Sequence, residues 1–307
     1  MRPRDVALAT LVAVIWGLGF IATRIGLDSF TPPQLAALRF LIAGLPAAVL
    51  PRPPIPWPPL VAIGLTLFAG QFLFQFFGIA SGMPPGLASV IVQTQAFFTV
   101  LFAAVALGER PARRQVIGMA AALVGVLLIA LTVGQNLTAL GLGIGVASAV
   151  SWAIGNVLVK RVGRVEMLGL MVWLSVIPPL PSLALSLAID GPASLARAVP
   201  ASSWGGLASA LYLGLVATVF AYAVWGDLLR RYPAATVAPF ALLVPFVAAL
   251  ASSAVFGERF GPARLAGMAF VLLGLVLIAV PASVGLIGAR GNGRARRGGR
   301  PPTPASH

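Results

Sequence analysis

Polar side chains inside long apolar segments are the residues of this chain that could do chemistry, and Arg39 is the only charged one well inside such a segment. An ionised group in apolar surroundings is costly, so it usually faces a cavity or pairs with carbonyl groups. The Arg39 guanidinium could bind the carboxylate of a small molecule. It could equally reach out of the segment, or bind loop carbonyls that hold the helix ends.

Amide side chains occur in the same kind of segment. Gln71 and Gln75 are four residues apart, so they share one face of a helix. Gln93 and Gln95 lie on two different sides of the next segment, which therefore cannot rest against lipid and is expected at the centre of a bundle. Either could give a zwitterionic ligand neutral hydrogen bonds, or could bind a neighbouring helix instead.

Aromatic residues follow helical spacing near the start of the chain and again near its middle. Trp16 begins a stripe at i, i+3, i+4 and i+7, and Trp152 with Asn156 lies on a related stripe; both stripes should face inward. Asn156 either bonds a neighbouring helix or lines a substrate path. Tyr222 could form an aromatic wall with Trp225, or both could mark the membrane interface.

Two prolines interrupt the apolar segment 234–256. Pro239 and Pro245 each remove a backbone donor and free a carbonyl one turn earlier, which predicts a kink or hinge. The freed carbonyls could bind substrate amines, or the prolines could only shape helix packing.

The composition explains why these residues stand in apolar segments. Of the 307 residues 59% are hydrophobic and 9% charged, and the mean hydropathy is +0.98, so most of the surface must face lipid. Apolar stretches of about 20 residues, the length that crosses a bilayer, recur ten times. They predict an all-α polytopic membrane protein with ten transmembrane helices, at 6–23, 33–50, 59–80, 86–107, 115–132, 137–159, 167–189, 204–225, 234–256 and 263–280.

The basic residues predict the orientation. With both termini in the cytoplasm of a bacterial inner membrane, sixteen of the 21 Lys and Arg residues fall on the cytoplasmic side. Residues 283–307 are rich in Gly, Arg and Pro and are expected to form a disordered cytoplasmic tail that touches anionic lipid. Membrane lipids are therefore expected partners, and nucleic acid is not.

The chain repeats itself. An offset of 149 residues aligns the Gly-Glu-Arg corner at 108–110 with that at 257–259, and an offset of 136 aligns Trp16 with Trp152. We expect two halves, 1–133 and 134–282, each with five helices. Because five is odd, the second half enters the membrane from the opposite side, an inverted repeat typical of alternating-access transporters. A duplication that only builds a stable bundle is the other interpretation.

Residues at matching places in the two halves carry further predictions. Glu109 and Glu258 stand at the two Gly-Glu-Arg corners and predict an ion pair or a contact with a helix end. Close helix contact is predicted at four glycines: Gly118, Gly125, Gly267 and Gly274.

Several of these motifs resemble the EamA family of the drug/metabolite transporter superfamily, namely VIWG at 14–17, LRF at 38–40, the stretch 83–98 and both Gly-Glu-Arg corners. The stretch GMPPGLASVIVQTQAFFT is similar to the branch that exports O-acetylserine and cysteine. The resemblance implies ten helices in two inverted repeats, a central cavity, and efflux of amino acids and their derivatives.

The sequence argues against catalysis. There is no cysteine, the single histidine is His307, no carboxylate stands in the middle of an apolar segment, and no phosphate-binding Gly-rich loop with lysine is present. We therefore expect no enzyme activity, cofactor or metal. The expected function is export of small amino acids or amino-acid metabolites; the alternatives are export of another metabolite or drug, or a membrane sensor without transport.

Overall fold

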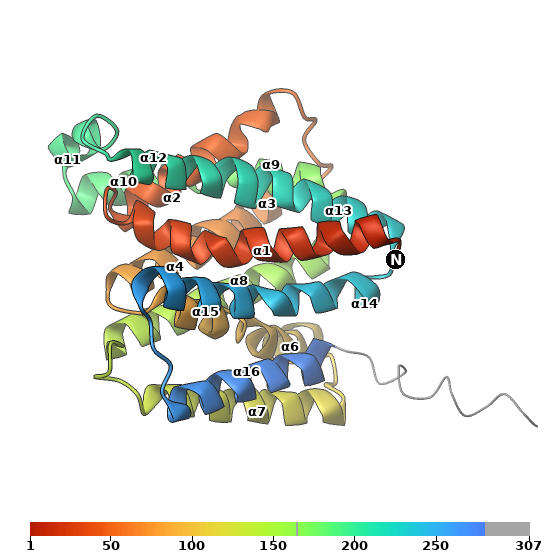
Figure 1. The fold of residues 1–307 in the computed structure, drawn as a ribbon. Helices are drawn as coiled ribbons and strands as arrows, with labels where there is room; N and C mark the ends of the chain where they lie inside the picture. The colour runs from red at the N-terminus through yellow and green to blue at the C-terminus, as the bar shows by residue number, and fades with distance from the viewer. Residues whose placement is uncertain (164, 280–307) are drawn as a thin grey trace, which may run out of the picture.

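The computed structural model describes residues 1–163 and 165–279, and within these residues every regular element is a helix (Figure 1). The predicted all-α class is confirmed for this part of the chain. Residues 280–282 of the predicted second half and the predicted tail 283–307 lie outside the described residues.

Nine helical stretches of the described chain are long and apolar enough to cross a membrane. In the first half these are α1 (Pro3–Gly26), α3 (Trp57–Ile63) with η2 (Gly64–Gly70) and α4 (Gln71–Ala80), α5 (Pro85–Val92) with α6 (Gln95–Leu107), and α7 (Arg113–Ala130). The later ones are α8 (Ala139–Val162), α9 (Met167–Ser175) with α10 (Pro179–Ile189), α12 (Trp204–Leu211) with η3 (Tyr212–Phe220) and α13 (Ala221–Arg231), η4 (Ala238–Leu242) with α15 (Leu243–Phe256), and α16 (Pro262–Ala279). The short helices α11 (Pro192–Arg197) and α14 (Ala234–Val237) lie between them.

The remaining predicted segment, 33–50, is helical but short. α2 (Pro32–Gly44) gives way to a 3₁₀ turn, η1 (Leu45–Ala48), which has Pro46 in its first turn. A proline cannot donate to the preceding helical turn, so the α-helix ends there. The structure thus has nine full-length spans within the described residues, and α2 with η1 stands where a tenth was expected.

Two spans contain π-helical segments, η2 and η3. A π-helix bonds i to i+5 and is common at functional sites. Side chains of neighbouring helices bind carbonyls in both segments. The hydroxyl of Ser151 donates to the Thr66 carbonyl at 2.7 Å, and Trp16 Nε1 donates to the Ala217 carbonyl at 3.0 Å.

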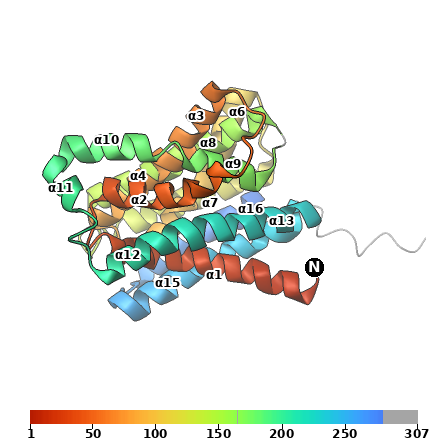
Figure 2. The ribbon, with the colours of Figure 1, turned by 90° about the horizontal axis from the view of Figure 1, so that it is seen from above.

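The helices form a layered bundle in which α1 lies between α12 and α13 on one side and α15 on the other (Figures 1 and 2). α7 and α16 form a close pair at one edge of the bundle in Figure 1. A Cβ at Gly118 would lie 2.8 Å from the Gly274 carbonyl oxygen, and one at Gly125 would lie 2.5 Å from that of Gly267. The predicted close contact at these glycines is confirmed.

The two Gly-Glu-Arg corners make different contacts. The Glu258 carboxylate accepts hydrogen bonds from the backbone N–H groups of Gly86 at 3.0 Å and Leu87 at 3.3 Å, at the start of α5, and from the Ser252 hydroxyl. Glu109 instead forms a surface ion pair with Lys160, with 2.5 Å between the charged atoms. The predicted helix-end contact is found at one corner and the predicted ion pair at the other.

Candidate functional site

A cavity of about 390 Å³ lies within the bundle. Its walls come from α1, α2, the span of η2 and α4, the span of α5 and α6, α8, α9, and the two spans that contain η3 and η4. The nine residues that the sequence singled out all line this one cavity: Trp16, Arg39, Gln71, Gln75, Gln93, Gln95, Trp152, Asn156 and Tyr222.

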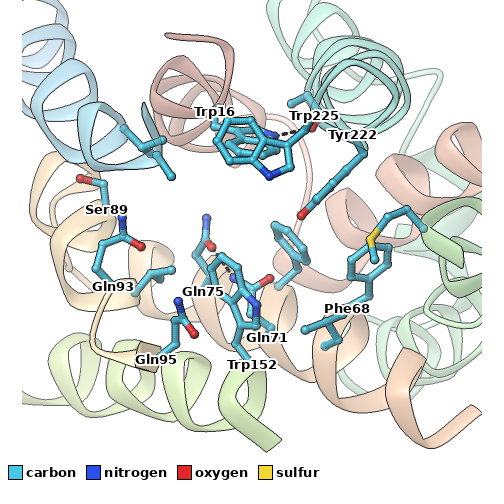
Figure 3. Close-up of a pocket in the computed structure, with 18 of the residues that line it drawn as sticks. Trp16, Phe68, Gln71, Gln75, Ser89, Gln93, Gln95, Trp152, Tyr222 and Trp225 are labelled. Carbon is cyan, nitrogen blue, oxygen red and sulfur yellow. Dashed lines mark hydrogen bonds between the residues drawn. The ribbon is translucent and has the colours of Figure 1, made fainter. Parts of the chain in front are cut away.

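One side of the cavity is an aromatic wall. The ring of Trp16 lies 5.3 Å from that of Tyr222 and 5.1 Å from that of Trp225, centroid to centroid. Figure 3 shows these three rings on one side and the glutamines across from them. Because the Trp16 indole N–H bonds the Ala217 carbonyl in η3, the ring is held in place. Tyr222 and Trp225 thus build a wall of the cavity.

Arg39 is 5% exposed and has no acidic partner among the described residues. Its guanidinium carbon lies 3.9 Å from the ring centroid of Phe72, a cation–π contact. One terminal nitrogen donates to the Thr218 hydroxyl at 3.2 Å, and that hydroxyl donates to the Leu213 carbonyl at 2.8 Å. The Arg39 Nε is buried without a hydrogen bond. A buried donor without a partner is costly, so the hydrogen-bonding needs of this guanidinium are not fully met by the described residues.

Two amides of α4 pair with each other. Gln71 Nε2 donates to Gln75 Oε1 at 2.8 Å, and both side chains are buried. The hydroxyl of Ser148, on α8, donates to the Gln71 carbonyl at 2.8 Å and joins the two helices. The pair leaves the Gln75 amide N–H groups and the Gln71 side-chain oxygen free to bind a ligand.

A second polar cluster joins α6 to α8. Asn156 Nδ2 donates to Gln95 Oε1 at 2.8 Å and to the Thr99 hydroxyl at 3.2 Å. Asn156 therefore bonds a neighbouring helix, as the first of its two predicted roles required, and it also lines the cavity; whether this wall is a substrate path stays a prediction. Gln93 stands in the break between α5 and α6, and its side chain lines the cavity (Figure 3).

The segment 85–107 is central only in its first part. Every residue of α5 is buried, whereas in α6 only Ala103 is buried and Val105 is 81% exposed. The expected central position therefore applies to α5 and to the glutamines at the break.

The two prolines lie where the α-helix is interrupted, although neither lines the cavity. Pro239 is in the 3₁₀ segment η4, and Pro245 is in the first turn of α15. Between them, Ala241 and Val244 reach the cavity wall. The interruption of the helix is shown, and movement at this point remains a prediction.

Several lining residues were not singled out from the sequence. Phe68, Phe72, Met167 and Met171 are apolar, and the sequence gives no sign that separates them from residues of an ordinary core. Met167 is the first residue of α9 and lies against Gly226 of α13, and Arg231 at the end of α13 pairs with Asp5 close to the N-terminus. The cavity therefore extends toward the end of the bundle that carries the N-terminus.

An apolar helical bundle with an internal cavity, mostly apolar but lined by a few polar side chains, is the architecture of a membrane transporter. The chain belongs to the EamA-like transporter family, whose model matches residues 4–131 and 139–280. The resemblance to this family is therefore confirmed.

Relatives are similar over nearly their whole length. A Salmonella typhimurium protein and an Escherichia coli K12 protein, each named a probable amino-acid metabolite efflux pump, are 39% identical to this chain over 90% of it and 95% of their own length. A Streptantibioticus cattleyicolor protein named a probable terminal-alkyne amino-acid exporter is 29% identical over 87% of this chain and 91% of its own. One solved crystal structure has a similar fold, with a TM-score of 0.61 and 19% identity over 91% of this chain and 98% of that one.

Proposed function

We propose that this protein is a secondary transporter that exports small amino acids or amino-acid metabolites across the bacterial inner membrane. The observation that carries the proposal is the cavity inside the bundle, in which a buried arginine, amide side chains and an aromatic wall face one space. A guanidinium matches a carboxylate, and the amides match the polar groups of an amino-acid derivative. The names of the relatives support this substrate class.

The proposed mechanism is alternating access between two five-helix halves, 1–133 and 134–282, inserted in opposite directions, with α2 as the tenth crossing. The sequence repeat and the two matches of the family model support it. The two π-helical segments, Gly64–Gly70 and Tyr212–Phe220, also lie at places that the 149-residue offset brings together.

The state described here is proposed to be open to the cytoplasm. The cavity extends toward the end of the bundle that carries the N-terminus, and the distribution of basic residues puts that end inside the cell. At the other end, the contact of Glu258 with α5 holds the two halves together. Bending at Pro239 and Pro245 is proposed to accompany opening of that end.

In this proposal Arg39 binds the substrate carboxylate, and Trp16, Trp152 and Tyr222 bound the site. The five amides supply neutral hydrogen bonds; they are Gln71, Gln75, Gln93, Gln95 and Asn156.

Export is tested by comparing metabolites in the medium of cells with and without the gene, followed by flux of the identified compound into vesicles that contain the purified chain. The expected result is more amino-acid metabolite outside the expressing cells and saturable flux in vesicles. No change for any amino acid or derivative would reject the substrate class, and binding without flux would favour a sensor. Reporters fused to the two termini should both face the cytoplasm.

A further inference from the structure

The cavity has one charge and no counter-charge. Arg39 is its only charged lining residue, and no Asp or Glu lines it. All seven acidic residues of the chain lie in its described part, and each has partners elsewhere.

Four of these carboxylates form ion pairs: Asp5 with Arg231, Asp28 with Arg24, Glu109 with Lys160, and Asp227 with Arg230 and Arg231. The other three accept hydrogen bonds: Asp190 from Thr31 and Ser186, Glu166 from the N–H groups of Leu168 and Gly169, and Glu258 at the start of α5. No acidic side chain is therefore left to neutralise Arg39 or to receive a substrate ammonium group.

A second observation points to an anionic ligand. Arg39 is only 5% exposed, and its Nε has no hydrogen-bond partner in the described chain. Its other contacts, with the Phe72 ring and the Thr218 hydroxyl, are to uncharged groups. An opposite charge stabilises a buried charge of this kind, and since no acidic side chain supplies one, we take a ligand as its source.

The same charge disfavours a substrate cation. An ammonium group in the cavity would meet the field of Arg39 in surroundings that screen it poorly. The aromatic wall of Trp16, Tyr222 and Trp225 could attract a cation, but that attraction acts against repulsion within the same cavity.

The amides offer what an uncharged acyl group needs. With Gln71 donating to Gln75 and Asn156 donating to Gln95, the remaining N–H groups and oxygens of these pairs can bind a C=O and an N–H of the ligand. A primary amide is complementary to the secondary amide of an acylated amine.

We propose that the cavity selects amino-acid carboxylates whose amine is acylated, prefers them to zwitterionic amino acids, and rejects cationic derivatives, with Arg39 as the residue that sets this order. The proposal rests on the proposed function and names the substrate class within it.

The test measures binding to the purified full chain in detergent, so that it does not depend on flux. Radiolabelled N-acetylserine is the probe. Three unlabelled compounds that share the serine side chain but differ in net charge compete with it: N-acetylserine (anionic), serine (zwitterionic) and serine methyl ester (cationic). We expect N-acetylserine to bind about tenfold more tightly than serine, and the methyl ester to compete more weakly than either. Absence of N-acetylserine binding, or an ester that competes as well as the anion, overturns the proposal.

Two variants in the cavity test the role of charge. Arg39→Gln should lower the affinity for N-acetylserine by about tenfold or more and should reduce the difference in affinity between N-acetylserine and the methyl ester. Arg39→Lys keeps the positive charge and should keep the order of affinity of the three compounds. Gln93→Glu adds a carboxylate to the wall with little change of shape and should shift the order toward the ester. If Arg39→Gln does not fold, Gln93→Glu still decides, since an unchanged order in that variant contradicts selection by charge.

The matched control is Arg24→Gln, which removes one positive charge at an exposed position paired with Asp28, away from the cavity. It should leave the order of the three compounds unchanged. Flux measured after the same purified chain is reconstituted into vesicles separates the two proposals. If the three compounds bind in the expected order of affinity but no flux is found, export is contradicted and the proposed selectivity stands. If flux is found but the order of affinity is reversed, only the selectivity is contradicted.

Discussion

The two Gly-Glu-Arg corners have the same sequence and the same backbone turn but different surroundings. Gly108 and Gly257 both have φ of 66°, a left-handed conformation that glycine adopts readily, and each ends a helix. Beyond that turn, Glu258 contacts the start of α5, whereas Glu109 lies on the surface with 44% of its side chain exposed. The local motif therefore fixes the turn, and the neighbouring helix decides what the carboxylate does.

One pair of equivalent positions in the sequence repeat matches the different contacts of the two glutamates. The 149-residue offset pairs Ser252, whose hydroxyl donates to Glu258, with Ala103, which has no such donor. A carboxylate that accepts a hydroxyl and two backbone N–H groups is held in place, while a single exposed ion pair holds a side chain weakly. Glu258 therefore bonds to Leu87 and Gly86, which stand 171 and 172 positions before it in the other half of the sequence.

The largest effect should come from Glu258→Ala. The change leaves the Gly86 and Leu87 N–H groups without their acceptor, and it should lower the free energy of unfolding by about 1–3 kcal/mol. Thermal unfolding of the purified protein in detergent measures this loss. Glu109→Ala is the matched control, and equal losses at the two corners would erase the difference between them.

A smaller effect is expected for Ser252→Ala. Loss of the hydroxyl removes one of three hydrogen bonds to the Glu258 carboxylate and should cost about 1 kcal/mol in the same measurement. In a Glu258→Ala background, Ser252→Ala should no longer change the free energy of unfolding. An undiminished cost in that background would show that Ser252 acts through other contacts.

Stability should also depend on pH through Glu258. Burial raises the pKa of its carboxyl above the ordinary value of 4.5, and the hydrogen bonds from Ser252, Gly86 and Leu87 only partly oppose that rise. The folded protein then holds this proton to higher pH than the unfolded chain, so stability is greatest on the acid side and falls as pH rises from about 4.5 through the raised pKa. Melting temperatures across this range should show a smaller fall for Glu258→Gln than for the parent.

The smallest effect belongs to the surface corner. Glu109→Ala should change the free energy of unfolding by about 0–1 kcal/mol, because the pair with Lys160 is exposed to solvent and screened. Raising the salt concentration should reduce this difference further. A loss as large as that of Glu258→Ala would mean that Glu109 has a partner in another conformation.

Much of the candidate site could be predicted because polar side chains in apolar helices are unfavourable against lipid and tend to lie inside the bundle. Gln75 and Asn156 are disfavoured against lipid and were expected to point into the bundle, whereas Arg39 could also have reached out of it; the structure places all three around one cavity. Their individual contacts could not be predicted. The stacking of Arg39 on Phe72 depends on how two helices rotate against each other, which spacing along one helix does not determine.

The fold was predictable to the same degree. Apolar length predicted ten spans, nine of which are full-length within the described residues, but it could not show that α2 ends at the 3₁₀ turn around Pro46. The different fates of Glu109 and Glu258 also escaped prediction, since they depend on which helix begins beside each corner.

A π-helical segment changes which faces of a helical span point toward the cavity on either side of it. Each residue of an α-helix turns the chain by about 100°, so the wider turn of a π-helix offsets the faces on its two sides relative to an unbroken α-helix. The span 57–80 can thereby present its glutamines to the cavity while its first turns pack elsewhere. Removing one residue from η2 should restore the regular turn and change the angle at which Gln71 and Gln75 face the cavity, although neither residue would itself be altered.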